Sequence, residues 1–403
     1  MTFFLLSITI LSLIPGQLLR MPFFNVPQGL ILTDFLVFFT LMIWSMQKIL
    51  TNRLTILKSL INLPLFLTVL WFLISLIWGA LWLNLDFNAI IFSSFFLLRF
   101  AGYAGIFFIV KEQKQKKKKN LIKLVLASIL TLSVLGIMQI IFFPNLTSLS
   151  QYGWDPHQNR LVSTWLDPNF LGAIIVIGIC LLLYFFYQEK TRKKNIFYYC
   201  AFLLLFTSVF LTFSRSAYLM LLISLLIFSL MQYLQQQKAV QKRNIALLFI
   251  LPLVFILVIL IIPQSRQRII GAKNIDQTAS FRIESWKNTY AIAKKNLITG
   301  TGFNTFRFAQ EKYGKIKEVS HSSTGSDSSF LLVFATTGIL GFCLYLWLYW
   351  TMIKITWKKW KIGRVLGLAV LSILIGLLAH SQFVNSLFYP HIILVIWILL
   401  GVI

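Results

Sequence analysis

Residues 169–187 read NFLGAIIVIGICLLLYFFY, a run that contains no charged side chain. A helix of about 20 apolar residues is long enough to cross the hydrocarbon core of a bilayer. Charged residues return directly after the run, at Glu189 and Lys190. We therefore interpret this stretch as a transmembrane helix.

Similar runs recur along the whole chain of 403 residues. The composition agrees, because 58% of the residues are hydrophobic and only 12% are charged, whereas soluble proteins carry about 25% charged residues. The predicted spans are residues 2–19, 27–46, 60–83, 87–110, 121–143, 169–187, 196–213, 216–234, 245–263, 329–350, 365–383 and 387–403. The sequence thus predicts an all-α, polytopic membrane protein with about twelve transmembrane helices in a single domain, residues 1–403.

The net charge of +26 comes largely from basic residues in alternate connections between these spans, such as Lys48, Lys116 to Lys119, and Lys358. The positive-inside rule places such connections, and hence both termini, in the cytoplasm. Topology and anionic lipids explain the lysine run, so we predict membrane lipids and no nucleic acid as partners. The first span has neither a basic leader nor a cleavage site, so we expect a helix rather than a signal peptide.

The one large loop, residues 264–328, is extracytoplasmic in this topology. Apolar residues recur in it at spacings of three and four, at Ile283, Trp286, Tyr290, Ala293 and Leu297, while Arg282, Ser285 and Thr289 share another face. This spacing predicts an amphipathic helix that lies along the membrane surface or caps the bundle. Beyond it, Gly300 and Gly302 either only end the helix or form a tight turn whose backbone approaches a ligand closely.

Three arginines lie where a cytoplasmic topology cannot explain them. Arg215 falls at an external turn between two spans, Arg160 in a second external loop, and Arg282 on the polar face of the loop helix. Arg215 could snorkel to lipid headgroups, but guanidinium groups also pair bidentately with phosphate oxygens. Together the three predict a site for a diphosphate. Asp34 and Arg99 lie inside spans, where each needs a partner, and we expect them to have a structural role, paired with each other or with other polar groups.

His321 and Asp327, just before the span at residues 329–350, are the external candidates for a general base. Histidine can take a proton at neutral pH, and a carboxylate can do so when it is partly desolvated. The alternative for His321 is an ordinary solvated loop residue. The spacing of His, Cys and carboxylate residues predicts no metal site, and no cofactor is expected.

Several short motifs follow one another in a fixed order. They are Trp165 to Gly172, Phe213 to Ala217, Arg282 to Trp286, Leu297 to Phe303, Asp327 to Leu331, and Thr337 to Gly341. This order resembles the O-antigen ligase and polymerase family over roughly residues 150–345, and the twelve-helix layout with a large loop before the tenth span, similar to GT-C-type transferases, agrees with it.

The resemblance implies a metal-independent membrane glycosyltransferase of the bacterial cytoplasmic membrane, with its active site outside. Members of the family take a glycan from an undecaprenyl diphosphate carrier and attach it to an acceptor. The resemblance places Arg215 and Arg282 at the diphosphate, with Arg160 as a third contact. The family usually reads His-Asn where this chain reads Asp327-Ser328, so the base is a choice between Asp327 and His321.

The leading hypothesis is a polysaccharide polymerase, which joins lipid-linked repeat units to the hydroxyl of an acceptor glycan. The departure at Asp327 disfavours the ligase branch, which transfers finished glycan to a lipid or protein acceptor, but that activity remains an alternative. A transporter of a lipid-linked anionic glycan is a third hypothesis, and the lack of an internal repeat argues against it. A chain-length regulator is a further candidate partner.

Overall fold

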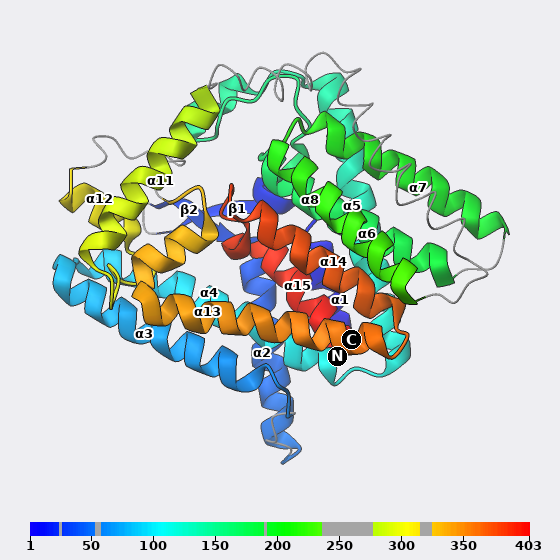
Figure 1. Cartoon of the computed structure of the whole chain (residues 1–403), viewed down its shortest axis with the longest axis horizontal. Helices are drawn as coiled ribbons and strands as arrows, with labels where there is room; N and C mark the ends of the chain where they lie inside the picture. The colour runs from blue at the N-terminus through cyan, green and yellow to red at the C-terminus, as the bar shows by residue number, and fades with distance from the viewer. Residues whose placement is uncertain (24–25, 53–57, 189–191, 236–276, 315–324) are drawn as a thin grey trace.

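The computed structural model describes residues 1–23, 26–52, 58–188, 192–235, 277–314 and 325–403. Within this part of the chain the molecule is a bundle of helices with one small sheet (Figure 1). Among the described residues, seven helices are long and apolar enough to cross a membrane, namely α2 (Leu32–Leu50), α3 (Asn62–Leu83), α4 (Phe87–Lys111), α5 (Gln115–Phe142), α6 (Pro168–Gln188), α8 (Arg215–Gln235) and α13 (Ser329–Lys361). The all-α, polytopic membrane architecture predicted from the sequence is therefore confirmed.

Shorter apolar helices complete the set. They are α1 (Thr2–Leu11), α7 (Arg192–Leu211), α14 (Val365–His380) and α15 (Pro390–Val402). The seven long and four short helices match every predicted span except residues 245–263, which lie outside the described residues.

The N-terminal region differs from the prediction. Helix α1 ends at Leu11, and a short 3-10 helix, Gly16–Leu19, leads into strand β1 (Arg20–Phe23), which pairs with strand β2 (Val26–Ile31). The predicted span at residues 2–19 is thus too long, and the next span begins with a strand. The segment after the break requires glycine at position 16, because a φ of +53° is unfavourable for other residues and a Cβ there would lie 2.5 Å from the Trp165 ring.

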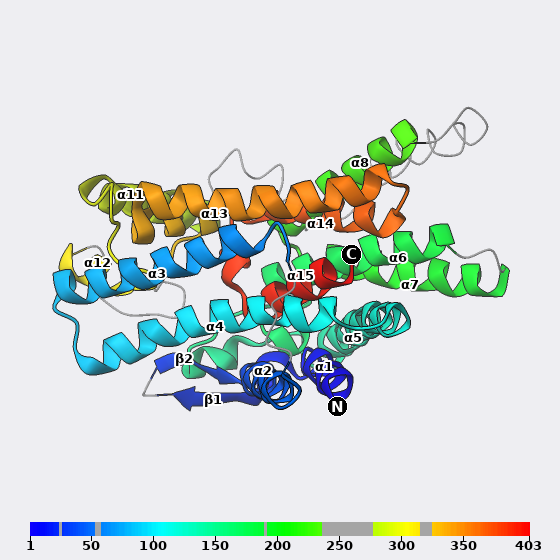
Figure 2. The same cartoon turned by 90° about the horizontal axis from the view of Figure 1, so that it is seen from below.

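Helix α15 runs through the centre of the bundle. Every residue from His391 to Val402 is buried, and Figure 2 shows the helix between α13 on one side and α4 on the other. A helix that is apolar on all faces needs such burial. In contrast, α3 exposes large apolar side chains such as Phe66 and Trp78, which a lipid environment would cover.

One ion pair lies inside the bundle. The Arg99 guanidinium on α4 donates two hydrogen bonds to the Asp34 carboxylate on α2, and the Tyr103 hydroxyl donates a third at 2.9 Å. The backbone N–H of Ile31 also donates to Asp34, at 3.0 Å. The predicted pairing of Asp34 with Arg99 is therefore confirmed, and the carboxylate is fully hydrogen-bonded.

The connection between α5 and α6 folds back into the bundle. It contains two 3-10 helices, Thr147–Tyr152 and Ser163–Trp165. The Trp165 indole is fully buried and its Nε1 donates to the Leu13 carbonyl at 2.9 Å, while the Ser163 hydroxyl donates to the Leu132 carbonyl at 2.8 Å. These contacts fix the segment that carries Arg160 and Asp167.

The large loop contains helices α11 (Gln277–Lys295) and α12 (Phe306–Lys312), and α11 packs on α13 (Figure 1). The predicted loop helix is thus confirmed, but its inward face follows the apolar pattern only in part, with Ala293 buried and Trp286 half-buried. Ile283 and Tyr290 are exposed, whereas Thr289 is fully buried. The reason is that the Thr289 hydroxyl donates to the Ser326 hydroxyl at 3.1 Å, so the polar face packs against the segment before α13.

The residues Gly300 to Gly302 dock this loop onto the bundle. Two backbone N–H groups of this segment donate to carbonyls of α13, that of Thr301 to Ala335 at 3.0 Å and that of Gly302 to Thr336 at 2.8 Å. Those carbonyls are available because α13 is interrupted at Gly338, whose φ is 66° and ψ −171°. The close backbone approach predicted for the glycines is therefore made to the bundle itself. A 3-10 helix, Ser386–Phe388, joins α14 to α15.

Candidate functional site

Asp167 stands at the start of α6. One carboxylate oxygen accepts hydrogen bonds from the backbone N–H groups of Asn169, at 2.7 Å, and Phe170, at 3.2 Å. Such a residue satisfies N–H groups that the first helical turn leaves without partners. The Trp165 anchor and this cap together hold Asp167 at the end of the bundle where the large loop docks.

Arg160 holds the turn between α7 and α8. Its guanidinium donates to the carbonyl of Thr212 at 2.9 Å and, more weakly, to that of Phe213 at 3.4 Å. Phe213 has a φ of +48°, so the turn adopts a backbone that is uncommon for a large side chain. Arg160 thus stabilises the turn directly before Arg215 and places a positive charge beside it.

Arg282 and Asp327 come from two segments that hydrogen bonds hold together. Arg282 lies on α11, where Ser285 accepts a hydrogen bond from the Asp327 backbone N–H at 3.3 Å. Ser328 caps α13 by accepting from the Leu331 N–H at 3.3 Å. Asp327 is therefore fixed between α11 and the start of α13, and its side chain is half-buried.

These charged groups interact electrostatically across two connections of the chain, the one between α5 and α6 and the large loop before α13. Asp327 interacts with Arg282, Asp155 and Asp167, and Asp167 interacts with Arg160 and Arg282. Asp155 interacts with Asp167, His157 and Arg160. We call Asp155, Arg160, Asp167, Arg282 and Asp327 the loop cluster.

The surroundings make each carboxylate of the loop cluster easier to protonate. Removal of water raises the pKa of Asp327 above its usual value, Asp155 and Asp167 raise it further, and Arg282 opposes the change. Burial likewise raises the pKa of Asp167, against the backbone N–H donors and the two arginines. Asp155 keeps contact with solvent, but desolvation and Asp167 raise its pKa as well. A carboxylate with a raised pKa is a stronger base than one in free solution.

Arg215 is the first residue of α8 and is half-buried. The preceding Ser214 donates its hydroxyl proton to the Asn169 side-chain oxygen at 2.8 Å. Because Asn169 follows Asp167 by two residues, this bond joins the start of α8 to the start of α6. The structure thus brings Arg160, Arg282 and Asp327 into one electrostatic cluster and places Arg215 at the turn that Arg160 holds.

The other candidate base, His321, lies outside the described residues. Sequence reasoning did not assign Asp155 and Asp167 to the site, although both stand in the external loop and Asp167 belongs to the motif before α6. The sequence feature that could have assigned them to the site is the concentration of charged residues in this short external connection. His380, the last residue of α14, is fully buried, its Nδ1 lies 3.0 Å from the Ser386 hydroxyl, and it interacts electrostatically with Arg282.

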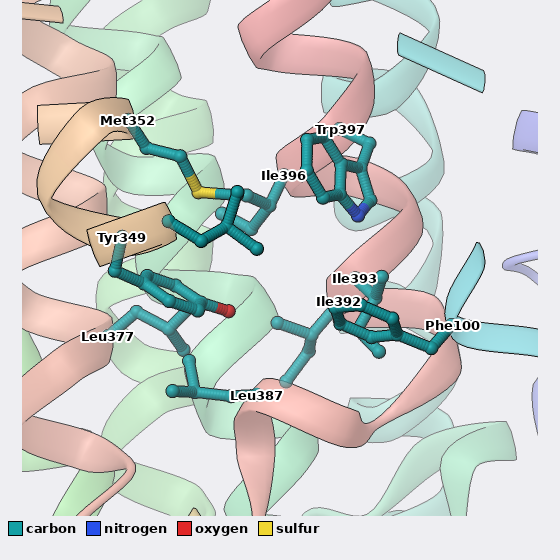
Figure 3. Close-up of a pocket in the computed structure, with 10 residues that line it drawn as sticks. Phe100, Tyr349, Met352, Leu377, Leu387, Ile392, Ile393, Ile396 and Trp397 are labelled. Carbon is teal, nitrogen blue, oxygen red and sulfur yellow. The ribbon is translucent and has the colours of Figure 1, made fainter. Parts of the chain in front are cut away.

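A separate cavity lies inside the bundle, between α4, α13, α14 and α15 (Figure 3). Its lining side chains are apolar apart from the Tyr349 hydroxyl and the Trp397 indole nitrogen, and its volume is about 10 Å³. That space holds about one water molecule. The cavity is therefore too small for a lipid chain or a sugar.

The family model described as O-Antigen ligase matches residues 200–346. The match includes Arg215, Arg282 and Asp327, and it runs through α8, α11 and the interrupted part of α13. Asp155, Arg160 and Asp167 precede it. No curated protein matches the chain.

Proposed function

We propose that the chain belongs to the O-antigen ligase and polymerase family, whose model matches residues 200–346, and that it is a polysaccharide polymerase. The family match and the apolar helices support the assignment of a multi-pass membrane enzyme of the glycosyltransferase or ligase type, which acts on a lipid-linked glycan. Our proposal is narrower. The enzyme takes a glycan from an undecaprenyl diphosphate carrier and transfers it to a sugar hydroxyl at the outer face of the cytoplasmic membrane, without a metal ion.

The loop cluster is the observation that carries this proposal. Two arginines and a half-buried carboxylate with a raised pKa converge there, next to the turn that presents Arg215. Guanidinium groups suit the oxygens of a diphosphate, and a carboxylate with a raised pKa suits proton abstraction. A transporter needs no such base, so the combination favours a transferase.

In the proposed reaction, the acceptor hydroxyl oxygen attacks the anomeric carbon of the donor glycan. The bond between that carbon and the diphosphate oxygen breaks, and the diphosphate leaves with the electron pair. The hydroxyl proton passes to the Asp327 carboxylate. Arg215 and Arg282, with Arg160 as a third contact, neutralise the charge that develops on the leaving group. Holding donor and acceptor in line supplies much of the remaining rate acceleration.

The topology completes the proposal. Both termini lie in the cytoplasm, so that the lysine-rich connections face inward and the large loop at residues 264–328 faces outward. The basic residues after α4 and at the end of α13 would then contact anionic lipid headgroups.

The test is polymer synthesis by the purified protein in liposomes supplied with lipid-diphosphate repeat units. We expect Arg215→Ala and Arg282→Ala to abolish long products. Arg307→Ala is the matched control, because Arg307 pairs on the loop surface with Glu311 at 3.1 Å. Wild-type product lengths in both Arg215→Ala and Arg282→Ala would overturn the proposal, and relocation of the glycan without new bonds would indicate a transporter.

The same variants separate a polymerase from a ligase in cells. Loss of a polymerase leaves single lipid-linked repeat units, because no chain is built. Loss of a ligase leaves long lipid-linked chains, because finished chains are not transferred. Accumulation of single repeats in cells that carry Arg282→Ala is the expected result.

A further inference from the structure

Arg20 lies on strand β1, outside the loop cluster and outside the residues matched by the family model. Its guanidinium carbon lies 4.7 Å from the centre of the Trp154 ring, which belongs to the connection between α5 and α6. Burial lowers the pKa of Arg20 to about 10. A cation in this position therefore loses much of its hydration.

No carboxylate compensates Arg20 among the described residues. The ion pairs found there join other residues, and the buried Nε of Arg20 has no hydrogen-bond acceptor. Asp34 is near enough to interact with it, but that carboxylate is already bound by Arg99 and Tyr103. Partly desolvated charges of this kind usually have a partner or a function.

A second unpartnered atom lies close by. The buried Gln17 donates from Nε2 to the Tyr389 hydroxyl at 3.0 Å, while its Oε1 has no donor among the described residues. Tyr389 also interacts electrostatically with Arg20. One donor and one acceptor without partners thus stand around the same tyrosine.

We propose that Arg20 and Gln17, with Trp154 as the support of the guanidinium, form a second anion-binding subsite that holds the acceptor glycan. The ligand would supply an oxyanion, as a phosphate or a sugar carboxylate, to Arg20 and a hydroxyl proton to Gln17. This inference rests on the proposed transferase function, because a transferase binds an acceptor as its second substrate and the subsite would bind that acceptor.

The position of the subsite suits an acceptor. Tyr389 interacts electrostatically with both Arg20 and Asp167, and its ring stacks on Phe170 with centroids 3.9 Å apart. It therefore stands between the subsite and the loop cluster. Stacking on the indole leaves the N–H edge of the guanidinium available for two parallel bonds to an oxyanion. Donor and acceptor would thus bind on opposite sides of Tyr389.

The experiment counts bound ligands on the full-length protein in nanodiscs of neutral lipid, by native mass spectrometry. The probes are undecaprenyl diphosphate, glucuronic acid and phosphatidylglycerol. If the acceptor's diphosphate is the anion, wild-type protein binds two undecaprenyl diphosphates and Arg20→Ala binds one. If a sugar carboxylate is the anion, wild type and Arg20→Ala both bind one lipid diphosphate, and only wild type binds glucuronic acid.

Two variants guard against a simple folding defect. Arg20→Lys keeps the charge but loses the bidentate geometry, and we expect intermediate binding. Gln17→Glu would put a negative charge in the subsite and repel an anion, so it should abolish binding there without creating a cavity. Arg307→Ala should behave as wild type.

The outcomes separate this inference from the proposed function. If Arg282→Ala loses the donor lipid diphosphate and Arg20→Ala loses the second ligand, the proposed function and the acceptor subsite are both supported. Unchanged binding of the lipid diphosphate and the sugar acid in Arg20→Ala and Gln17→Glu overturns the acceptor subsite, whatever Arg282→Ala does. Dependence of phosphatidylglycerol binding alone on Arg20 would also overturn it, because the site would then hold a membrane lipid.

Discussion

Two groups of charged residues in this protein are built from the same kinds of side chain but differ in how far solvent reaches them. Asp34 and Arg99 form a bidentate pair inside the bundle, with Tyr103 and the Ile31 N–H completing the carboxylate. In the loop cluster, Asp155 and Asp327 remain partly accessible to solvent and interact electrostatically with Arg160 and Arg282. A closed network, shut off from solvent, stabilises a fold, whereas an open one, which solvent reaches, can still bind a substrate.

The strongest way to test this contrast is to break the closed pair. Arg99→Ala would leave Asp34 charged and buried without its partner, and we expect a loss of about 3–5 kcal/mol in the free energy of unfolding. Thermal unfolding of the purified protein in detergent measures the effect. The double variant Asp34→Leu with Arg99→Leu should recover much of the loss, because it buries no charge. In contrast, Arg282→Ala should unfold close to the wild-type temperature.

In the loop cluster, the corresponding change should affect catalysis rather than stability. Asp327→Asn removes the proposed base but keeps the size of the side chain, and we expect the rate of polymer synthesis to fall about 10²- to 10⁴-fold. The unfolding temperature should hardly change. Glu311→Gln, on the exposed surface of the same loop, is the control. Full activity of Asp327→Asn would remove Asp327 from the mechanism and direct attention to His321.

A third change acts on the connection between fold and site. Gly338 has a backbone conformation open mainly to glycine, and a Cβ there would clash with the Ile298 carbonyl. Gly338→Ala should therefore cost about 1–3 kcal/mol, and it should lower activity because the loop that docks there carries Arg282. Thermal unfolding and polymer synthesis measured together check both effects. Gly325→Ala has open space around it, and unfolding at the wild-type temperature is expected for it.

The sequence predicted the parts of this structure that depend on local pattern. Span-length apolar runs identified the helices, and a buried charge in one span implied the buried charge in another, so Asp34 and Arg99 could be paired. The inward face of α11 could not be read this way, because Thr289 is buried by a hydrogen bond to Ser326, which is 37 residues away. Hydrophobic periodicity carries no information about such a partner. For the same reason Arg20 and Gln17 went unnoticed, since only the fold brings them to Tyr389.

The smallest expected effect is a shift in the pH dependence of the reaction, and it tests the open cluster most directly. The base must be deprotonated, so activity should fall as the pH drops through the pKa of Asp327. Asp155 raises that pKa and Arg282 lowers it. Asp155→Asn should therefore shift the acidic limb of the pH–rate profile, where activity falls, to lower pH. In Arg282→Gln, the acidic limb of the residual activity should shift to higher pH.

Rates measured across the acidic range in the liposome assay give the position of the limb. Glu311→Gln, which removes a carboxylate that does not interact with Asp327, should leave the limb where it is in the wild type. Opposite shifts in the two cluster variants would identify the titrating base as Asp327 or Asp167, the two carboxylates that interact with both Asp155 and Arg282, and the loss of activity in Asp327→Asn would then single out Asp327. A limb that moves in neither variant belongs to a group outside the cluster.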